Sequence, residues 1–95
     1  MLTKEEFARK LARKGYTLKD ARIIINDFIE TVSECLVEKE GVHFVGFGTF
    51  FVKTFKGQTI KTVQGSEVTI DDYDMPRFKP ATSIKRAVKE GFIRR

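Results

Sequence analysis

The stretch Gly46-Phe47-Gly48-Thr49-Phe50 constrains the fold of this chain more than any other segment. Its two glycines stand two residues apart between aromatic residues, and glycine tolerates both a positive φ angle and a close approach of backbone. The pattern predicts a sharp strand-to-strand turn with no room for side chains at the glycines. Phe44, Phe47 and Phe50 would then converge on one apolar centre. Taken alone, the motif is typical of any tight β-hairpin.

A short amphipathic helix is predicted near the start of the chain, over residues 3–14. Thr3 followed by Glu6 is a capping box, in which a hydroxyl oxygen and a carboxylate satisfy free amides of a first helical turn. Gly15 suits the position after the last turn, because glycine adopts the left-handed conformation without strain.

A much longer helix is predicted over about residues 18–39, beginning at Thr17 with Asp20 three residues later and closing at Gly41. Apolar residues recur along it at helical spacing, and the stripe that they form is wide. A helix of this length spans roughly 30 Å, which is long for a chain of 95 residues. We therefore expect a second copy of the chain to cover the stripe. The alternative is a monomer in which this helix packs against the strands.

Extended structure is predicted on both sides of the glycine turn. Residues 42–45 form a short strand, and from Thr49 onward the side chains alternate between two faces. Phe51, Lys53 and Phe55 share one face, which is an unusual grouping for a face toward water.

Residues 51–74 are predicted to form a two-stranded ribbon that projects from the body, with a turn at Gln64-Gly65-Ser66. In the alternative interpretation, this segment folds back as a third strand of the sheet.

A second short helix is predicted over about residues 82–90, after Pro80 prevents the preceding residue from being helical. Thr82 or Ser83 is the expected N-cap. Three bases follow one side of this helix: Lys85, Arg86 and Lys89. No placement follows from the sequence for the tail Phe92–Arg95.

Net positive charge is confined to the second half of the chain. Residues 1–40 are neutral overall, whereas residues 53–66 carry a net charge of +3 and residues 77–95 a net charge of +6. An acidic segment at residues 67–74, with a net charge of −4, separates the two basic regions. A basic bias of this kind points to a polyanionic partner.

Residue types that carry catalysis or bind metals are sparse. Cys35 is interpreted as a buried thiol of the long helix, and His43 as a satisfied or solvent-facing strand residue. Asp71, Asp72 and Asp74 lack the glycine and distal glutamate of a calcium loop, so they are interpreted as a solvated turn. We therefore expect no enzyme activity, no cofactor, no metal and no small-molecule substrate.

The single cysteine fits a reducing cytoplasm, where disulfides are rare. There is no stretch of about 18 apolar residues, so no membrane span is expected. We therefore expect a cytoplasmic protein.

In their order, these segments resemble the bacterial histone-like HU and integration host factor family. The resemblance spans about residues 1–90. It depends on two motifs, the Gly46-to-Phe50 turn and Pro76-Arg77-Phe78-Lys79-Pro80. The distance between them in the chain is close to the family spacing of about thirty residues. It implies one α+β domain over residues 1–95 that forms an intertwined homodimer. The helical dimerisation part would cover about residues 1–41, the sheet and β-arm about 42–80, and a C-terminal helix about 82–90.

The same resemblance implies that two β-arms reach around double-stranded DNA in its minor groove and bend it. The residues that would contact DNA are Lys53, Lys56, Lys61, Thr62, Val63, Arg77, Lys79, Lys85, Arg86 and Lys89. The residues that would form the dimer core are Ile25, Phe28, Ile29, Val32, Phe44, Phe47, Phe50 and Phe78. Neutralised phosphates release counterions, so binding would depend steeply on salt.

The arm departs from the family pattern. Family arms usually carry Arg-Asn-Pro near the tip, where the proline wedges between base pairs, whereas this chain has Thr62 or Val63 at that position. Phe55 stands where the family often has a basic residue. The aspartates of residues 71–74 lie near the arm base and would repel phosphates if they faced the DNA.

Two functions are compatible with these features. The first is sequence-tolerant binding of duplex DNA by an architectural, nucleoid-associated homodimer. The second is a protein-interaction module of the same fold with weak or no DNA binding, since exposed ribbons and apolar patches attract protein partners. The contact residues of the second would be Phe51, Phe55, Ile60 and Val63.

Overall fold

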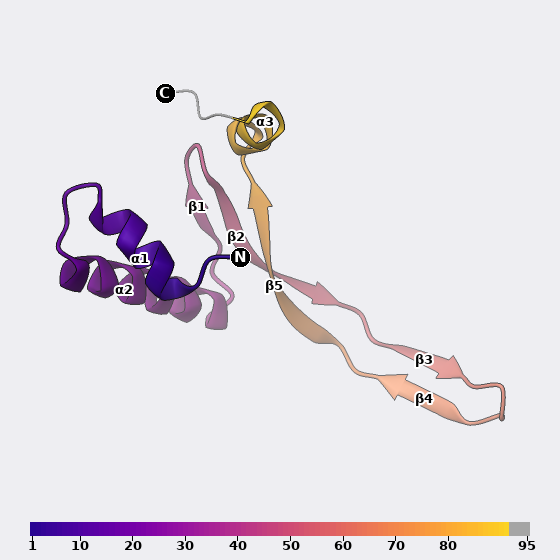
Figure 1. Cartoon of the computed structure of the whole chain (residues 1–95). Coiled ribbons are helices and arrows are strands. Elements are labelled where there is room, and N and C mark those ends of the chain that lie inside the picture. The colour runs from indigo at the N-terminus through magenta and orange to yellow at the C-terminus, as the bar shows by residue number, and fades with distance from the viewer. Residues whose placement is uncertain (92–95) are drawn as a thin grey trace. The chain divides into compact units, whose positions relative to one another are not determined.

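The computed structural model describes residues 1–91 and confirms the predicted α+β class; the tail Phe92–Arg95 lies outside the described residues. In chain order the elements are α1 (Lys4–Ala12), α2 (Leu18–Val37), β1 (Val42–Phe44), β2 (Gly48–Phe55), β3 (Gln58–Lys61), β4 (Glu67–Ile70), β5 (Tyr73–Pro80) and α3 (Thr82–Glu90) (Figure 1). The chain divides into two compact units, one of Met1–Glu34 and one that begins at Cys35.

The first unit is a pair of helices whose starts match the predicted capping signals. The Thr3 hydroxyl accepts a hydrogen bond from the Glu6 amide at 3.2 Å, and the Thr17 hydroxyl accepts one from the Asp20 amide at 3.0 Å. The guanidinium of Arg22 on α2 donates two hydrogen bonds to the Glu5 carboxylate on α1. These polar contacts align the two helices along their exposed side.

The buried core of this unit is small. Ala8 of α1 packs against Ala21 and Ile25 of α2, and three further apolar residues of the same two helices lie around them: Leu11, Ala12 and Leu18. Small side chains at Ala8 and Ala21 let the helices approach closely. Ile25, which the sequence placed in a dimer core, therefore lies inside the chain's own helical pair.

The long helix ends earlier than predicted, at Val37, and a different residue ends it. Lys39 adopts a left-handed conformation, with φ of +59°, and its amide donates to the Leu36 carbonyl at 3.0 Å. The Glu40 amide donates to the Cys35 carbonyl at 2.8 Å, which completes a Schellman motif. The prediction that Gly41 closes this helix was wrong. Cys35 is half-buried, where the sequence predicted a buried thiol.

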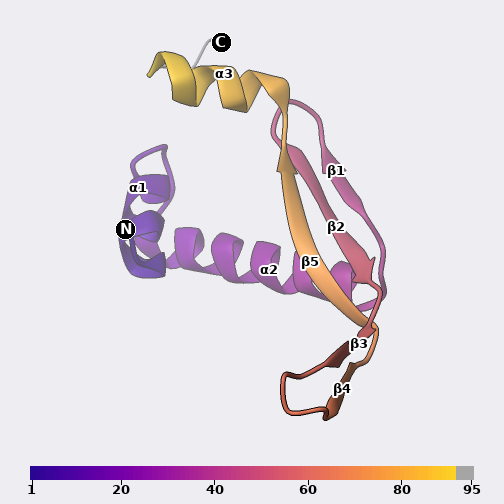
Figure 2. The same cartoon turned by 90° about the vertical axis from the view of Figure 1, so that its right-hand side faces the viewer.

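The second unit is built on an antiparallel sheet in the order β1-β2-β5 (Figure 2). Beyond Phe50, β2 pairs with β5 alone, and β5 contains both prolines of the chain, Pro76 and Pro80. Prolines are tolerated on edge strands because the ladder there needs fewer donors. The separate pair β3 and β4 continues outward from the end of β2 and β5, which confirms the predicted two-stranded ribbon.

The glycine turn forms as predicted between β1 and β2, but its two glycines serve different purposes. The Phe47 amide donates to the Phe44 carbonyl at 3.0 Å, and Gly46 adopts a φ of +79° there. A side chain at Gly46 would meet open space, so the expected lack of room was wrong at this position. At Gly48 it was right, because a Cβ atom would lie 2.6 Å from the Lys79 carbonyl oxygen and 2.7 Å from the Phe78 ring.

The close approach at Gly48 brings four aromatic rings together. The ring centroids of Phe50 and Phe78 lie 4.7 Å apart, and those of Phe47 and Phe78 lie 5.3 Å apart. Phe44 contacts both Phe47 and Phe50 edge-on, at 6.4 and 6.2 Å. The predicted convergence of Phe44, Phe47 and Phe50 is therefore confirmed, and Phe78 of the second motif completes the group.

Helix α3 is held to the glycine turn at its first residues. The Ala81 amide donates to the Phe47 carbonyl at 2.9 Å, and the Ser83 hydroxyl donates to the Gly46 carbonyl at 3.1 Å. The predicted cap was wrong, because the N-cap is Ala81 and no side chain caps the helix. Ser83 is instead a tether between the two sequence motifs, and Gly91 ends the helix with a φ of +84°.

The contact at Gly48 generates a stability prediction. We expect Gly48→Ala to lower the free energy of unfolding by about 2 kcal/mol or more, because the new methyl group would overlap backbone that cannot move independently. Gly41→Ala is the matched control, since a Cβ atom there makes only an ordinary contact of 3.7 Å with the Phe50 carbonyl oxygen. Urea unfolding followed by circular dichroism at equal protein concentrations measures both. Equal stability of the two variants would contradict the assignment.

Candidate nucleic-acid interface

The β2–β5 ribbon has two chemically different faces. Residues paired across an antiparallel ladder lie on the same face, and successive residues alternate between faces. One face carries the pairs Phe50–Phe78 and Val52–Pro76, which continue the aromatic core. The other we call the basic–aromatic face, and it comprises Thr49, Phe51, Lys53, Phe55, Tyr73, Met75, Arg77 and Lys79.

Three predicted DNA contacts meet on the basic–aromatic face. Lys53, Arg77 and Lys79 all lie on it and are exposed, whereas none of its eight residues is acidic. The two strands position these bases because their register places odd-numbered residues of β2 opposite odd-numbered residues of β5. A surface with three cations and no carboxylate is an electrostatic match for phosphates.

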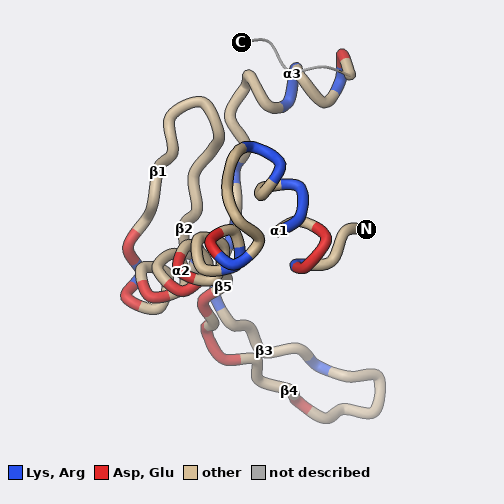
Figure 3. Tube along the Cα trace, turned by 60° about the vertical axis from the view of Figure 1, so that its left-hand side comes forward, with Lys and Arg blue, Asp and Glu red and all other residues tan. Residues whose placement is uncertain are grey.

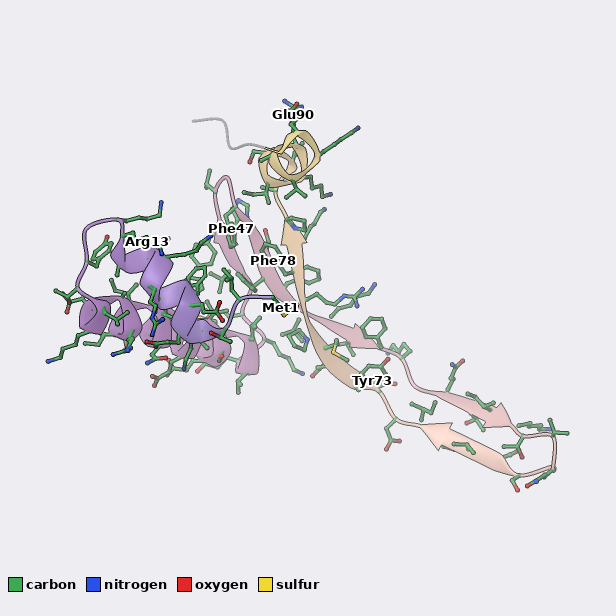
Figure 4. All side chains as sticks on the ribbon, viewed as in Figure 1. Met1, Arg13, Phe47, Tyr73, Phe78 and Glu90 are labelled. Carbon is green, nitrogen blue, oxygen red and sulfur yellow. The ribbon has the colours of Figure 1, made fainter. Side chains whose placement is uncertain are left out.

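An aromatic stack lies at the outer end of the same face. The rings of Phe55 and Tyr73 are nearly parallel, at 16° with centroids 5.3 Å apart. The Lys53 ammonium and the Arg77 guanidinium lie 5.2 and 5.5 Å from the centre of the Phe55 ring, within the range of cation–π attraction. Figure 4 shows Tyr73 on the arm side of β5, beyond Phe78 of the aromatic core.

One aspartate at the arm base, Asp74, is kept off this face. Asp74 lies on the opposite face, where its carboxylate accepts a hydrogen bond from the Thr54 hydroxyl at 2.6 Å and pairs with Lys39 at 3.1 Å. These contacts, with Thr54 first and Lys39 second, hold the pKa of the Asp74 carboxyl below its usual range. This carboxylate therefore does not lie on the basic–aromatic face, where it would repel bound phosphates.

Asp72 organises the junction between the sheet and the outer ribbon. Its carboxylate accepts a hydrogen bond from the Gly57 amide at 2.6 Å and lies 4.0 Å from the Lys56 ammonium. A side chain at Gly57 would overlap the Ile70 carbonyl, so glycine is required where the strands cross from one pair to the next. The interpretation of these aspartates as a merely solvated turn was therefore incomplete. Among the described residues, no group of three or more His, Cys, Asp or Glu is placed to hold a metal ion.

The arm tip is a compact turn organised by Thr62. Its amide donates to the Ser66 carbonyl at 2.7 Å, its carbonyl accepts from the Gly65 amide at 3.0 Å, and its hydroxyl accepts from the Ser66 amide at 3.1 Å. Val63 makes no comparable contact and projects fully into solvent. Of the two residues predicted at the tip, Thr62 thus shapes the turn, whereas Val63 presents the apolar side chain.

The remaining predicted bases are distributed along the unit. Lys61 lies next to the tip, opposite Glu67 in the β3–β4 register. Lys85, Arg86 and Lys89 line one shallow hollow on α3, together with Thr82 and Glu90. Figure 3 shows Lys and Arg as separate blue segments on the arm, β5 and α3.

The predicted dimer-core residues remain partly exposed in the single chain. Phe28 and Ile29 of α2 are 44% and 48% exposed, and Phe47 and Phe78 of the aromatic core are 44% and 40% exposed. Val32, Phe44 and Phe50 are half-buried. Ile25 alone among the predicted set is buried.

Several residues that organise the arm base were not predicted as site residues. Tyr73 was missed because it lies 18 residues after its partner Phe55. An alternating pattern within one strand does not reveal which residue of another strand lies opposite. Lys39 and Thr54 were missed because the partner of each is Asp74, 35 and 20 residues away in the chain. Gly57 carried a readable signal, a glycine interrupting an extended run.

The comparisons with known proteins agree with this geometry. Residues 2–89 match the sequence profile of the family described as bacterial DNA-binding protein. A DNA-binding protein HU of Thermotoga maritima is 34% identical over 90 residues, which cover 93% of this chain and 100% of that protein. An integration host factor subunit alpha of Idiomarina loihiensis is 35% identical over 92 residues, covering 93% and 92%.

Among solved structures, the chain resembles one in an Anabaena HU–DNA cocrystal, with a TM-score of 0.81 at 22% identity over 92% of this chain and 97% of that one. That likeness shows a shared fold. Within the described range, no helix has the length and apolar character needed to span a bilayer. The chain belongs to the bacterial DNA-binding protein family that includes HU and integration host factor.

Proposed function

We propose that the protein binds double-stranded DNA as an architectural, nucleoid-associated homodimer. The observation that carries the proposal is the basic–aromatic face, where Lys53, Arg77 and Lys79 lie together without a carboxylate. The DNA-binding proteins to which the chain is related support the same ligand. They are architectural proteins and not enzymes, as the sequence led us to expect.

The arm would follow the minor groove with its lysine side chains toward the phosphates. Lys56 and Lys61 lie along the ribbon between the sheet and the tip, so each would meet the DNA backbone farther from the body than Lys53. The lysine and arginine side chains of α3 would contact flanking DNA. Because lysine and arginine contacts to phosphate do not distinguish sequences, selectivity would come from the shape and deformability of the duplex.

The homodimer is supported by how little apolar surface one chain buries. Among the described residues, only Ala8, Ala21 and Ile25 are buried apolar residues, although the chain holds nine phenylalanines. Exposed apolar groups on this scale mark an interface with another polypeptide. A second copy of the chain is the partner that we propose, because a dimer with twofold symmetry covers the same patch on both chains.

Val63 would replace the wedge that proline forms at the arm tips of relatives. Its branched side chain is rigid about χ1 and projects from a turn held by three hydrogen bonds of Thr62. Apolar wedges pressed between base steps unstack them and kink the duplex. Bending without proline is therefore part of the proposal.

A protein-binding arm remains the second candidate, because the outer ribbon has an apolar side. Ile60 and Val68 face each other across β3 and β4, and both are about half exposed. This candidate predicts assemblies larger than a dimer at low salt and no affinity for duplex DNA.

The first prediction of this proposal concerns phosphate contacts. We expect the double variant Lys53→Glu, Lys79→Glu to bind a 30-base-pair duplex at least about tenfold more weakly, because two phosphate contacts become repulsive. The slope of log affinity against log salt should fall by about two. Fluorescence anisotropy at several salt concentrations measures both quantities.

Lys14→Glu, Lys19→Glu is the matched control, with the same change of charge on the helical unit. Equal losses in the two variants would show that net charge, and not the basic–aromatic face, drives binding. Unchanged affinity in both would show that the basic–aromatic face does not bind the duplex.

The second prediction concerns bending. With a duplex of about 30 base pairs labelled at both ends, we expect wild-type protein to raise energy transfer between the labels, and Val63→Ala to reduce that rise. Affinity should change less than bending, since the phosphate contacts persist. Val68→Ala on the same ribbon is the control. If Val63→Ala and Val68→Ala bend DNA equally to wild type, Val63 is not a wedge.

The third prediction concerns the dimer. We expect Ile29→Glu to abolish the dimer, because a carboxylate buried at an apolar interface without a partner costs several kcal/mol. Tyr16→Glu, at a residue of the same 48% exposure outside the predicted core, should leave it intact. Sedimentation equilibrium with circular dichroism separates dissociation from unfolding. Wild-type protein at monomer mass across the micromolar range would contradict the dimer.

A further inference from the structure

Two cations of the basic–aromatic face lie against one aromatic ring, that of Phe55. The Lys53 ammonium is 5.2 Å from the centre of this ring, and the Arg77 guanidinium is 5.5 Å from it. Phe55 is half-buried, whereas Lys53 and Arg77 are exposed. Exposed lysine and arginine side chains ordinarily sample many rotamers. The shared ring therefore restricts two side chains that would otherwise be free to move.

The Arg77 side chain extends along the ribbon toward the arm. In the strand register Arg77 lies opposite Phe51, and Phe55 is four residues farther along β2. That separation is roughly 13 Å at the rise of an extended strand. The Arg77 guanidinium nevertheless reaches the Phe55 ring. It does so by lying along the face, where a side chain that projected straight into solvent would not reach.

No carboxylate accounts for where these two cations lie. The ion pairs among the described residues involve the acids Glu5, Asp72 and Asp74, and none of them includes Lys53 or Arg77. Attraction between a cation and an aromatic ring is modest at an exposed site, but here it acts on two side chains at once. The ring is therefore the charged groups' common partner.

The Phe55 ring is itself held by its neighbour across the ladder. Phe55 pairs with Tyr73 in the register, and their rings are nearly parallel, at 16° with centroids 5.3 Å apart. Aromatic pairs across antiparallel strands stabilise a ribbon and restrict the rotamers of both members. Phe55 thus offers the two cations a surface of fixed position.

We propose that Phe55 is a positioning residue, which holds Lys53 and Arg77 together at the arm base as one pre-ordered site for DNA phosphates. This inference rests on the proposed duplex function and deepens it. A free lysine or arginine side chain loses rotamer freedom when a phosphate orders it, and that loss opposes binding. Side chains already held at one ring lose less. The neutral ring therefore raises the affinity for DNA through the two cations.

A purely structural role of Phe55 is the competing account. In that account Phe55→Leu weakens DNA binding by loosening the ribbon, whatever the cations do. The two accounts differ in whether the loss depends on Lys53 and Arg77. A double-mutant cycle measures that dependence directly.

The cycle combines Phe55→Leu with the double variant Lys53→Met, Arg77→Met, which keeps long side chains but removes their charge. In the wild-type background, we expect Phe55→Leu to weaken binding of a duplex of about 30 base pairs by about fivefold, because two side chains lose their order. In the double-variant background, the same change should cost less than about twofold. Fluorescence anisotropy measures all four proteins. Equal losses in the two backgrounds would overturn the inference.

Two further variants separate the ring from its apolar area. Phe55→Tyr keeps a flat ring that attracts cations, so its affinity should stay within about twofold of wild type. Phe51→Leu is the matched control, the same change on the same face of β2, and it too should cost less than about twofold. Losses of the same size in Phe51→Leu and Phe55→Leu would overturn the inference. Circular dichroism confirms that each variant is folded.

Proton NMR of the free protein supplies a readout that does not depend on DNA. The ring current of Phe55 should shift the ε-methylene protons of Lys53 and the δ-methylene protons of Arg77, and Phe55→Leu should return them to the positions of exposed side chains. Resonances that do not change in Phe55→Leu would overturn the inference even if the duplex binds. Shifted resonances in a wild-type protein that binds no duplex would support the positioning of the cations and overturn the proposed function.

Discussion

The close approach of β2 and β5 at Gly48 is the constraint on which the rest of the second unit depends. A Cβ atom at Gly48 would lie 2.7 Å from the Phe78 ring, so the absence of a side chain there lets the four phenylalanines of the core meet. Gly48 pairs with Pro80 at one end of the eight-pair register between the two strands. That register decides that Lys53, Arg77 and Lys79 share one face and that Asp74 lies on the other. The electrostatic character of the surface is thus a consequence of strand register.

The elements near one another in sequence were predictable, because local signals specify them. The caps at Thr3 and Thr17, the glycine turn and the two-stranded ribbon all follow from residues within a few positions of each other. The resemblance of the two motifs to a known family supplied the α+β fold. Predictions failed where a contact elsewhere in the chain, or another residue nearby, took the role that a local sequence rule assigns. Ser83 looked like a cap but binds the Gly46 carbonyl, and Lys39 took the left-handed position expected of a glycine.

The composition of the face could not be predicted in the same way. Phe51, Lys53 and Phe55 were recognised as an odd grouping, yet their partners Arg77, Met75 and Tyr73 follow only from the observed register. The aspartates illustrate the same limit. Their charge is visible in the sequence, but whether they repel DNA depends on contacts with Thr54, Lys39 and Gly57, which are distant in the chain.

The two prolines of β5 have a consequence for how the protein behaves in a crowded cell. Proline cannot donate a hydrogen bond, so the pairs Val52–Pro76 and Gly48–Pro80 must be the non-hydrogen-bonded kind, in which backbone N–H groups point away from the partner strand. The outer edge of β5 therefore lacks a donor at two of its four outward positions from Asp74 to Pro80. A strand from another molecule would find an interrupted ladder there. The exposed edge is in this way protected against extending into a continuous intermolecular sheet.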